Sequence, residues 1–402
     1  MMVIQTALLF LSIIIAAGLA YLYLLLIAGK PRAAVHAASP DGPPLRFAVA
    51  IPAHNEAGVI AATVRRLQEM SYPTDRFDVH VVADHCSDDT AAVAEVTGAI
   101  VHVRDEGPRG RKGYAVDWLI RRLLADPRRY DAIAIFDADS QVDAGFLAEV
   151  SRYLASGAEV VQGRHMIGNP GASRFAALAD ADMRLNNRIR NQAKANLGLS
   201  ARLMGDAMVF RREVLERHPW AGAESLTEDR DCGIYLATQG IRIHYAADAI
   251  SVGQAVSRWG DATPQRLRWY GGAFDLQRRY LVALAGVVWR RRSLDALDKL
   301  LELALPPFSL LALGSVLLLG IQGMLAWLGR QSMTGIAFSA GLALVAACFP
   351  FVGLAATGAP RAAYRALLAG PVYILWRVWI SLRVRLRPRS IAWIRTRRAG
   401  ER

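Results

Sequence analysis

The stretch Ala132-Ile-Ala-Ile-Phe-Asp-Ala-Asp-Ser-Gln-Val-Asp143 carries the pattern that decides the fold. Its apolar, β-prone run at residues 133–136 predicts a buried strand that ends at two carboxylates, Asp137 and Asp139. In an extended segment the i, i+2 spacing puts both carboxylates on one side, where they can converge on one hard cation. The same letters also suit a solvated turn with Asx caps, so the rest of the chain has to decide.

Similar units precede this stretch. Each has a short apolar strand, a polar turn or basic loop, and then a helical segment. This order predicts a parallel sheet with right-handed crossovers, and it places the polar turns on one edge of the sheet. Before this stretch, the predicted strands are residues 47–51, 79–83 and 100–103, and the predicted helices are residues 57–70, 91–97 and 114–124. After it, a strand is predicted at residues 160–163 and a helix at residues 173–197.

Apolar segments at the two ends predict a membrane protein. The 402-residue chain is 53% hydrophobic, and residues 3–28 are long enough to span a bilayer. Lys30 and Arg32 follow this segment, whereas a cleaved signal peptide would have a positive start and a shorter apolar region. We therefore predict a membrane anchor whose C-terminal end faces the cytosol.

A second apolar region predicts a helical hairpin formed by residues 300–328 and 336–356. Residues 364–386 are interrupted by arginines, and a further crossing would export the basic tail that follows them. We expect a cytosolic interfacial helix there, with Trp376, Trp379 and Trp393 at headgroup depth, and a true span is the alternative.

The net charge of +13 comes largely from arginines beside the apolar regions, which predicts contact with anionic lipid. No nucleic-acid motif accompanies them, so nucleic acid is not expected as a partner. The three cysteines lack metal-type spacing and indicate neither a zinc site nor a disulfide framework.

Two further turns contain candidate donor-binding residues. Asp84 ends a predicted strand beside the turn that contains Glu56, and its carboxylate could accept a hydrogen bond from a uracil imide or cap a helix. Lys112 lies between two glycines before a helix, a setting that favours phosphate, although basic loops are often only solvated.

Six motifs in order make the chain similar to the inverting, membrane-bound family 2 glycosyltransferases, which include cellulose, chitin-oligosaccharide and hyaluronan synthases and ceramide glucosyltransferase. The similarity covers residues 47–270. The motifs are Pro-x-His-Asn-Glu (52–56), Asp-His-Cys-Ser-Asp-Asp-Thr (84–90), Gly-Arg-Lys-Gly-Tyr-Ala (110–115), Asp-Ala-Asp (137–139), Thr-Glu-Asp (227–229) and Gln-Arg-Leu-Arg-Trp (265–269).

The resemblance implies a glycosyltransferase A-type, Rossmann-like α/β fold with a mostly parallel sheet, together with transmembrane and interfacial helices. It also implies roles on the donor side. Asp84 would contact the nucleotide base, and Asp139, with Asp137, would hold Mg²⁺ or Mn²⁺ on the diphosphate. Asp229 would be the general base. The other residues expected at the donor are Glu56, Lys112, Gln265, Arg268 and Trp269.

The acceptor is expected near Met204, Gly205, Asp206, Glu228 and Trp269. Asp206 could instead be a turn acid, and the acids from Glu228 to Asp231 could only cap a helix. Gln265, Arg268 and Trp269 could equally form a headgroup-binding helix face, because they lie at i, i+3 and i+4.

The expected protein is a multi-pass enzyme of the inner or plasma membrane with a cytosolic catalytic domain. It would transfer sugar from a nucleotide donor, expected to be a UDP-sugar, to a glycan or polysaccharide in a β-linkage. The alternatives are single transfer to a lipid-linked acceptor, a non-catalytic nucleotide or lipid sensor, and a metal-dependent phosphohydrolase. An oligomer or an export partner is a further possibility.

The expected regions are a transmembrane helix (1–30), a linker (31–46), the catalytic domain (47–255), an interfacial region (256–298), a membrane hairpin (299–358), and an interfacial or membrane helix with a basic tail (359–402).

Overall fold

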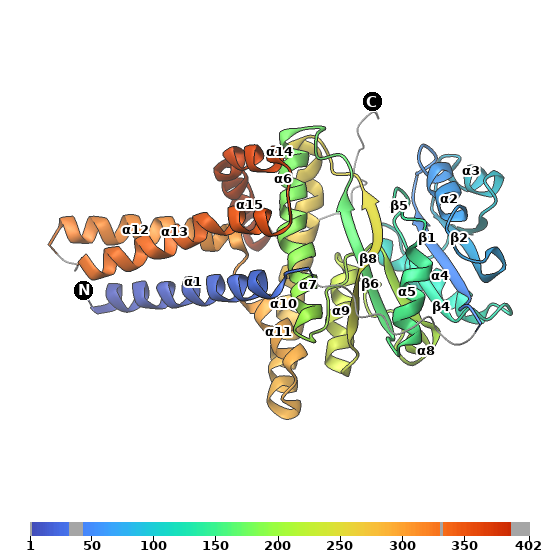
Figure 1. Cartoon of the computed structure of the whole chain (residues 1–402), viewed down its shortest axis with the longest axis horizontal. Helices are drawn as coiled ribbons and strands as arrows, with labels where there is room; N and C mark the ends of the chain where they lie inside the picture. Colours follow the sequence, from blue (N-terminus) through green and yellow to red (C-terminus); the bar gives the residue numbers. More distant parts are fainter. Residues whose placement is uncertain (1, 32–42, 330–332, 387–402) are drawn as a thin grey trace.

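The computed structural model describes residues 2–31, 43–329 and 333–386, which form an α/β domain and a bundle of long helices (Figure 1). The linker predicted at 31–46 falls largely outside these residues, as do the basic tail and Trp393. The strands are β1 (Phe47–Ala53), β2 (Phe77–Asp84), β3 (Ile100–Arg104), β4 (Ala132–Ile135), β5 (Gln141–Val142), β6 (Val160–Ile167), β7 (Met208–Arg211) and β8 (Ile243–Gly253).

Helices alternate with these strands in the first half of the domain. Those of the α/β domain are α2 (Ile60–Gln68), α3 (Thr90–Val96), α4 (Lys112–Ala125), α5 (Phe146–Ala155), α6 (Arg174–Met183), α7 (Arg190–Asn196), α8 (Arg212–Arg217) and α9 (Glu228–Gln239). The others are α1 (Met2–Ala28), α10 (Trp259–Arg291), α11 (Leu294–Ala304), α12 (Phe308–Trp327), α13 (Met333–Ala356), α14 (Arg361–Ala366) and α15 (Gly370–Leu386).

The described strands form one eight-stranded sheet in the order β3-β2-β1-β4-β7-β6-β8-β5. β1, β2, β3 and β4 pair in parallel, as the repeated units predicted. The second half differs, because β7 runs antiparallel to β4 and β6, and β5 runs antiparallel to β8, so the sheet is mixed. Met208, at the start of β7, pairs with Ile135, at the end of β4. β7 therefore begins at the edge of the sheet where β4 ends, and it runs in the opposite direction to β4.

Alternating side chains of β1 serve two hydrophobic layers. Phe47, Val49 and Ile51 face the layer that includes α2 and α5, whereas Ala48 and Ala50 face the layer that includes α4 and α9. All five are buried. The sheet is therefore covered on both faces, and its polar turns are left at the ends of the strands.

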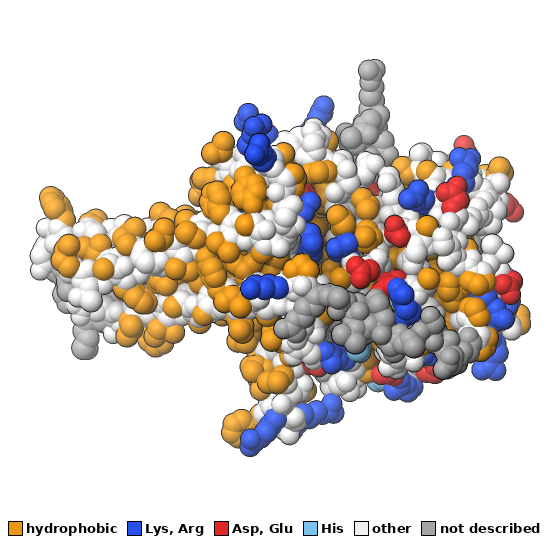
Figure 2. Space-filling view, in the orientation of Figure 1, with side chains coloured by type: hydrophobic (Ala, Val, Ile, Leu, Met, Phe, Trp, Pro, Cys, Tyr) orange, Lys and Arg blue, Asp and Glu red, His pale blue; other side chains and the backbone are white. Residues whose placement is uncertain are grey.

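Four described helices are long and apolar enough to cross a membrane: residues Val3–Ala28, Phe308–Trp327, Met333–Ala356 and Arg361–Leu386. α1, α12 and α13 lie side by side and project away from the sheet, while α14 and α15 lie at the base of this bundle (Figure 1). Hydrophobic side chains cover the projecting bundle, and acidic side chains gather over the sheet domain (Figure 2).

Several predicted elements differ in detail. The apolar block predicted from residue 300 is divided, because Pro306 and Pro307 separate α11 from α12. The helix predicted over residues 173–197 contains a π-helical segment, Arg184–Ile189. Trp376 packs against Trp259 of α10, with ring centroids 5.1 Å apart, whereas Trp379 is exposed; their depth in a membrane stays a prediction.

Candidate active site

A cavity of about 830 Å³ opens at the edge where β1, β2 and β4 end. It is lined by residues from the polar turns, from the first turn of α9 and from α10. Of the residues predicted for the site, twelve lie on its wall: Glu56, Asp84, Lys112, Asp137, Asp139, Met204, Gly205, Glu228, Asp229, Gln265, Arg268 and Trp269. Asp206 does not line it.

The turns after β1 and β2 are tied together beside this cavity. The backbone N–H of Glu56 donates to Thr90 Oγ1 at 2.7 Å. Asn55 and His85 have φ angles of 56° and 50°, a left-handed conformation that is uncommon for non-glycine residues. Such backbone strain clusters at binding sites, where the surrounding structure holds it in place.

Asp84 is buried at the end of β2 and has a partner that the sequence did not indicate. The parallel register pairs Asp84 with Arg104, at the end of β3, and their side chains form an ion pair. His85 Nδ1 also lies 2.9 Å from Asp84 Oδ1. Asp84 is thus held by two charged or polar partners on the wall of the cavity, and one of its two carboxylate oxygens, Oδ1, is already engaged.

Lys112, the first residue of α4, contacts both the loop after β4 and the loop that contains Gly205. Its ammonium pairs with the Asp137 carboxylate and donates to the Gly205 carbonyl, and Glu228 Oε1 lies 4.0 Å away. Burial would lower the pKa of Lys112, but the Asp137 and Glu228 carboxylates outweigh it and raise that pKa above its usual value. The side chain therefore carries a fixed positive charge beside Asp137.

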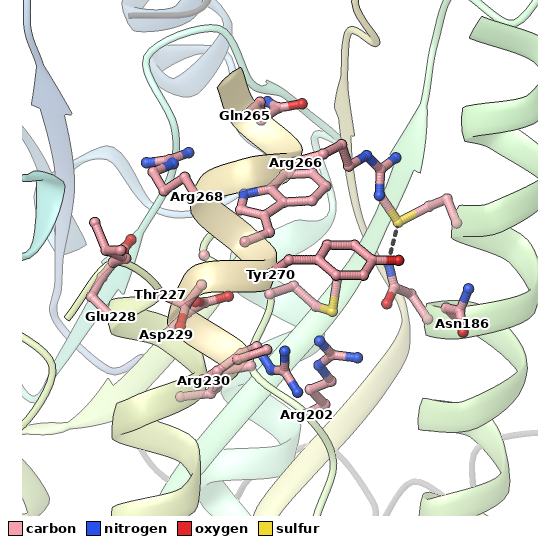
Figure 3. Close-up of a pocket in the computed structure, with 18 of the residues that line it drawn as sticks. Asn186, Arg202, Thr227, Glu228, Asp229, Arg230, Gln265, Arg266, Arg268 and Tyr270 are labelled. Atoms are coloured by element: carbon pink, nitrogen blue, oxygen red, sulfur yellow. Dashed lines mark hydrogen bonds between the residues drawn. The ribbon is translucent and has the colours of Figure 1, made fainter. Parts of the chain in front are cut away.

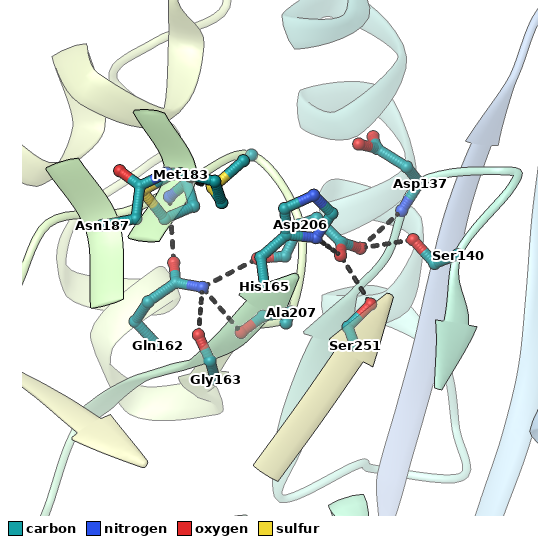
Figure 4. Close-up of polar contacts among 12 residues, drawn as sticks. Asp137, Ser140, Gln162, Gly163, His165, Met183, Asn187, Asp206, Ala207 and Ser251 are labelled. Atoms are coloured by element: carbon teal, nitrogen blue, oxygen red, sulfur yellow. Dashed lines mark hydrogen bonds and ion pairs between the residues drawn. The ribbon is translucent and has the colours of Figure 1, made fainter. Parts of the chain in front are cut away.

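Asp206 was expected at the acceptor, and the structure places its carboxylate elsewhere. It accepts hydrogen bonds from the Asp137 backbone N–H (3.0 Å), Ser140 Oγ (2.7 Å) and Ser251 Oγ (2.6 Å), and it pairs with His165 Nδ1 (2.7 Å; Figure 4). With 1% of its surface exposed, it is enclosed by these donors. The acid holds the Asp137–Ser140 loop in place, and sequence spacing could not reveal its four partners.

The ionic pair of Asp206 and His165 shifts the titration of both groups. Burial would raise the pKa of Asp206, but the bonds from His165, Ser251 and Ser140 outweigh it and hold that pKa well below its usual value. Burial would likewise lower the pKa of His165, but Asp206 outweighs it and raises that pKa.

Gly205 brings its loop, residues 204–206, close to Asp229. Its φ of 81° is a left-handed conformation that favours glycine, and a Cβ there would lie 3.5 Å from Asp229 Oδ2. Asp229 follows Glu228 in the first turn of α9. Burial, together with Asp229, raises the pKa of Glu228.

Gln265, Arg268 and Trp269 lie on α10 and line the cavity. Gln265 and Arg268 are labelled in Figure 3. The guanidinium of Arg266 stacks over the Trp269 ring, 4.6 Å from its centroid. Arg266 also pairs with Asp182 of α6 at 3.2 Å. This motif therefore has a second use, because its intervening arginine fixes the tryptophan against a neighbouring helix.

Arg377 of α15 completes this support. It pairs with Asp182 at 2.7 Å and donates to the Tyr270 hydroxyl at 2.6 Å. Burial would raise the pKa of Asp182, but Arg377 and Arg266 lower it to about 2. No motif indicated Arg377 because it lies 195 residues from Asp182.

The cavity extends beyond the predicted site toward the helix bundle. Its wall includes Gly18, Tyr21 and Leu22 of α1 and Phe308 and Leu311 of α12. The arginines on its wall that no motif indicated include Arg190 of α7, Arg202 in the segment before β7, and Arg230 of α9.

Two side chains on the cavity wall, Asp137 and Asp139, are the candidate protein ligands for a divalent cation. In the described ranges no group of three or more His, Cys, Asp or Glu side chains is arranged to hold a metal ion. Asp137 and Asp139 are oxygen donors of the kind that Mg²⁺ and Mn²⁺ prefer, and they lie on a loop fixed by Asp206. They fit a cation that takes its remaining ligands from a diphosphate.

Comparison with known proteins places this geometry in a family. Residues 43–272, more than half of the chain, match the model of a family described as glycosyltransferase like family 2. A solved mannosyltransferase of Pyrobaculum calidifontis, in complex with GDP-Man and Mn²⁺, is similar over 93% of this chain and 98% of its own, at 19% identity and a TM-score of 0.57. That similarity shows a shared fold.

Two kinds of curated relative are similar in sequence. A beta-monoglucosyldiacylglycerol synthase of Synechocystis sp. is 25% identical over 370 residues, which cover 86% of this chain and 73% of the relative. A probable glucomannan 4-beta-mannosyltransferase of Oryza sativa is 25% identical over 239 residues, which cover 58% of this chain and 43% of the relative.

Proposed function

The chain belongs to glycosyltransferase family 2 and is a glycosyltransferase, and on that basis we propose that it transfers a single sugar from a nucleoside-diphosphate donor to a lipid acceptor. One observation carries the choice of acceptor. The cavity that contains Asp229 continues to the apolar side chains of Leu22 on α1 and Leu311 on α12. A lipid held among those helices could present its headgroup to Asp229 without leaving the membrane.

The relatives favour the same choice. The beta-monoglucosyldiacylglycerol synthase is named for a glycolipid product, and the match to it spans this chain from the sheet domain into the helix bundle. A glycan or polysaccharide acceptor stays the second candidate, because other relatives are named glucomannan 4-beta-mannosyltransferases. Those matches cover less than half of the relative's length. The cellulose, chitin and hyaluronan synthase type of this family, and an export partner, belong to that second candidate.

The donor half is proposed to use the residues of the predicted site. Asp84 and Glu56 would contact the nucleotide base of the donor, and Lys112 would contact its diphosphate, since all three residues line the sheet side of the cavity. A UDP-sugar is our first choice of donor. Asp137 and Asp139 would hold Mg²⁺ or Mn²⁺, which would neutralise charge on the diphosphate.

Asp229 is proposed to remove the proton from the acceptor hydroxyl. Gly205 lets its loop, residues 204–206, approach this carboxylate closely. The hydroxyl oxygen then attacks the anomeric carbon while the bond to the diphosphate oxygen breaks, and Arg268 and Lys112 stabilise the charge of the leaving group. A single displacement inverts the anomeric centre, so an α-linked donor gives a β-linked product.

We propose that the enzyme lies in the inner or plasma membrane with residues 47–255 in the cytosol. Residues 1–30 and the hairpin within 299–358 would span the bilayer, and residues 256–298 would lie along its surface. The basic residues after α1 support this orientation. The position of α14 and α15 at the base of the bundle supports an interfacial segment within 359–402, although the apolar length of residues 361–386 also allows a span.

The test uses membranes that contain the full chain. They are incubated with labelled UDP- and GDP-sugars, with and without Mn²⁺, and the lipid extract and the aqueous polymer fraction are analysed separately by chromatography and mass spectrometry. We expect one sugar added to a lipid. Label in long, lipid-free glycan chains would instead establish the second candidate.

A further inference from the structure

We propose that Arg190, Arg202 and Arg230 bind a phosphate group on the acceptor lipid, which makes the preferred acceptor a phosphate-bearing lipid rather than a neutral one. This inference rests on the proposed transfer of sugar to a lipid. It adds the chemical class of headgroup that the cavity accepts.

The three arginines converge from separate parts of the fold. Arg190 begins α7, Arg202 precedes β7, and Arg230 lies in the first turn of α9 directly after Asp229. All three line the cavity that contains Asp229. Figure 3 shows the guanidinium groups of Arg202 and Arg230 close together beside Asp229 and below Tyr270. A headgroup that reached Asp229 would therefore meet these cations.

Acidic side chains nearby offset this charge only in part: Glu302 and Asp229 act on Arg230, but most of the acids are engaged by other cations. Glu302 lies 3.4 Å from Arg202, but it is shared with Lys194 at 2.8 Å. Lys194 also forms an ion pair with Asp298, with Nζ and Oδ2 2.9 Å apart. In the described part of the chain no carboxylate forms an ion pair with Arg190 or Arg230, and Arg202 Nε is buried without a hydrogen-bond partner. Asp182, the other acid near Arg190, is taken by Arg266 and Arg377.

The titration of two of these arginines agrees with an excess of positive charge. Burial, and then the neighbouring charge of Arg202, lower the pKa of Arg230 to about 10. Burial also lowers the pKa of Arg190, where Arg202 acts in the same direction. Partly buried cations that repel one another are stabilised when an anion enters between them, and guanidinium groups match phosphate oxygens in pairs.

The position of the cluster favours the acceptor's phosphate over the donor's. The donor side of the cavity already has Lys112 and Arg268 beside the metal-binding loop. Arg190 instead lies toward Tyr21 of α1, a helix of the projecting bundle. A phosphate held there would have its acyl or prenyl chains directed toward the apolar wall formed by Leu22 and Leu311.

The chemistry balances for either kind of phosphate-bearing lipid. The attacking oxygen forms the new bond to the anomeric carbon, the bond from that carbon to the diphosphate oxygen breaks, and the nucleoside diphosphate leaves with the electron pair. A headgroup hydroxyl beside a phosphodiester gives its proton to Asp229, whereas an ionised lipid monophosphate has none to give on the attacking oxygen.

The experiment compares three acceptors in detergent micelles with the purified full-length enzyme: phosphatidylglycerol, a polyprenyl phosphate and diacylglycerol. Acceptor and donor KM are measured for the wild type and for Arg202→Gln, Arg230→Gln and the conservative Arg202→Lys. Arg278→Gln is the matched control, because Arg278 is exposed on α10 and does not line the cavity. Donor-nucleotide binding by calorimetry confirms that each variant is folded.

We expect at least one phosphate-bearing lipid to be used in preference to diacylglycerol. Each Gln variant should raise its acceptor KM on the order of 10- to 100-fold, since bonds to charged groups are lost, while donor KM stays unchanged. Arg202→Lys should recover part of the loss, and Arg278→Gln should behave as wild type. The inference is overturned if the wild type and the Gln variants use diacylglycerol as well as they use the phosphate-bearing lipids. It is also overturned if only the donor KM rises. Either result leaves the proposed function standing. Transfer to no lipid at all would overturn both.

Discussion

The carboxylate of Asp206 accepts a hydrogen bond from the backbone N–H of Asp137 at 3.0 Å. This contact joins the loop of residues 204–206 to the loop proposed to hold the metal, across 69 positions of sequence. Asp206, a residue expected to touch the acceptor, therefore fixes the backbone of the loop that carries Asp137 and Asp139, the carboxylates proposed to hold the metal.

Asp206→Asn should weaken metal activation. The substitution keeps the size of the side chain but removes its charge and replaces one acceptor oxygen with a donor. That donor would face either Asp137 N–H and Ser140 or Ser251 and His165. Loss of such support for a metal-binding loop is expected to raise the Mn²⁺ concentration for half-maximal activity roughly 10- to 100-fold. Asp143→Asn, at an exposed acid close to the same loop, should leave that value unchanged. An unaltered Mn²⁺ response in Asp206→Asn would show that the network does not position the loop.

With an acceptor that attacks through a hydroxyl group, Asp229→Asn should nearly abolish transfer while nucleotide binding persists. Removal of a general base typically costs ~10²- to 10⁴-fold in rate. Sugar transfer and binding of the donor nucleotide are measured on the same preparation, with Asp275→Asn as the control, because Asp275 is exposed on α10. Activity close to wild type in Asp229→Asn would exclude this carboxylate as the base.

Breaking the Asp182 to Arg377 pair should lower both stability and rate. Removing one partner of this partly buried pair leaves the other charge less well compensated, at a cost below the roughly 3–5 kcal/mol typical of fully buried pairs, because Asp182 also pairs with Arg266. Arg266, which stacks over Trp269, loses the same partner when Asp182 is replaced. Thermal unfolding and kcat are measured for Asp182→Asn, Arg377→Gln and the double variant.

Arg383→Gln, an exposed change on the same helix α15, is the control for this pair. Because the two partners act as one unit, the double variant should lose much less than the sum of the single losses. Additive losses would mean that the pair does not act together in solution.

Thermal stability should fall as pH rises above neutrality because of His165. Its pKa is raised in the folded state, so the pair with Asp206 contributes fully below the unfolded pKa of ~6.5, and this contribution is lost as pH rises through the raised value. Apparent Tm is measured at a series of pH values from slightly acidic to alkaline. His165→Gln should remove this part of the pH dependence, whereas a variant curve parallel to wild type would contradict the assignment.

Much of the fold could be predicted because it is encoded locally. Short apolar runs followed by polar turns indicated β1, β2 and β4, and the parallel arrangement of those strands brought Asp84, Lys112 and Asp137 to one cavity. The direction of β7 could not be read in the same way, because it depends on where the chain re-enters the sheet after α6 and α7. The sheet is therefore mixed where the repeated units had suggested mostly parallel strands.

The sequence by itself determined the family motifs, the apolar helices and the set of carboxylates and cations at the strand ends, because each depends on residue type and short spacing. Tertiary structure alone decided which of these groups meet. The burial of Asp206 among four donors, the support of Arg266 by Asp182 and Arg377, and the convergence of Arg190, Arg202 and Arg230 all depend on packing between elements distant in the chain. The periodicity of one segment does not encode its distance from another, so these contacts arise only when the sheet and the helix bundle close around the cavity.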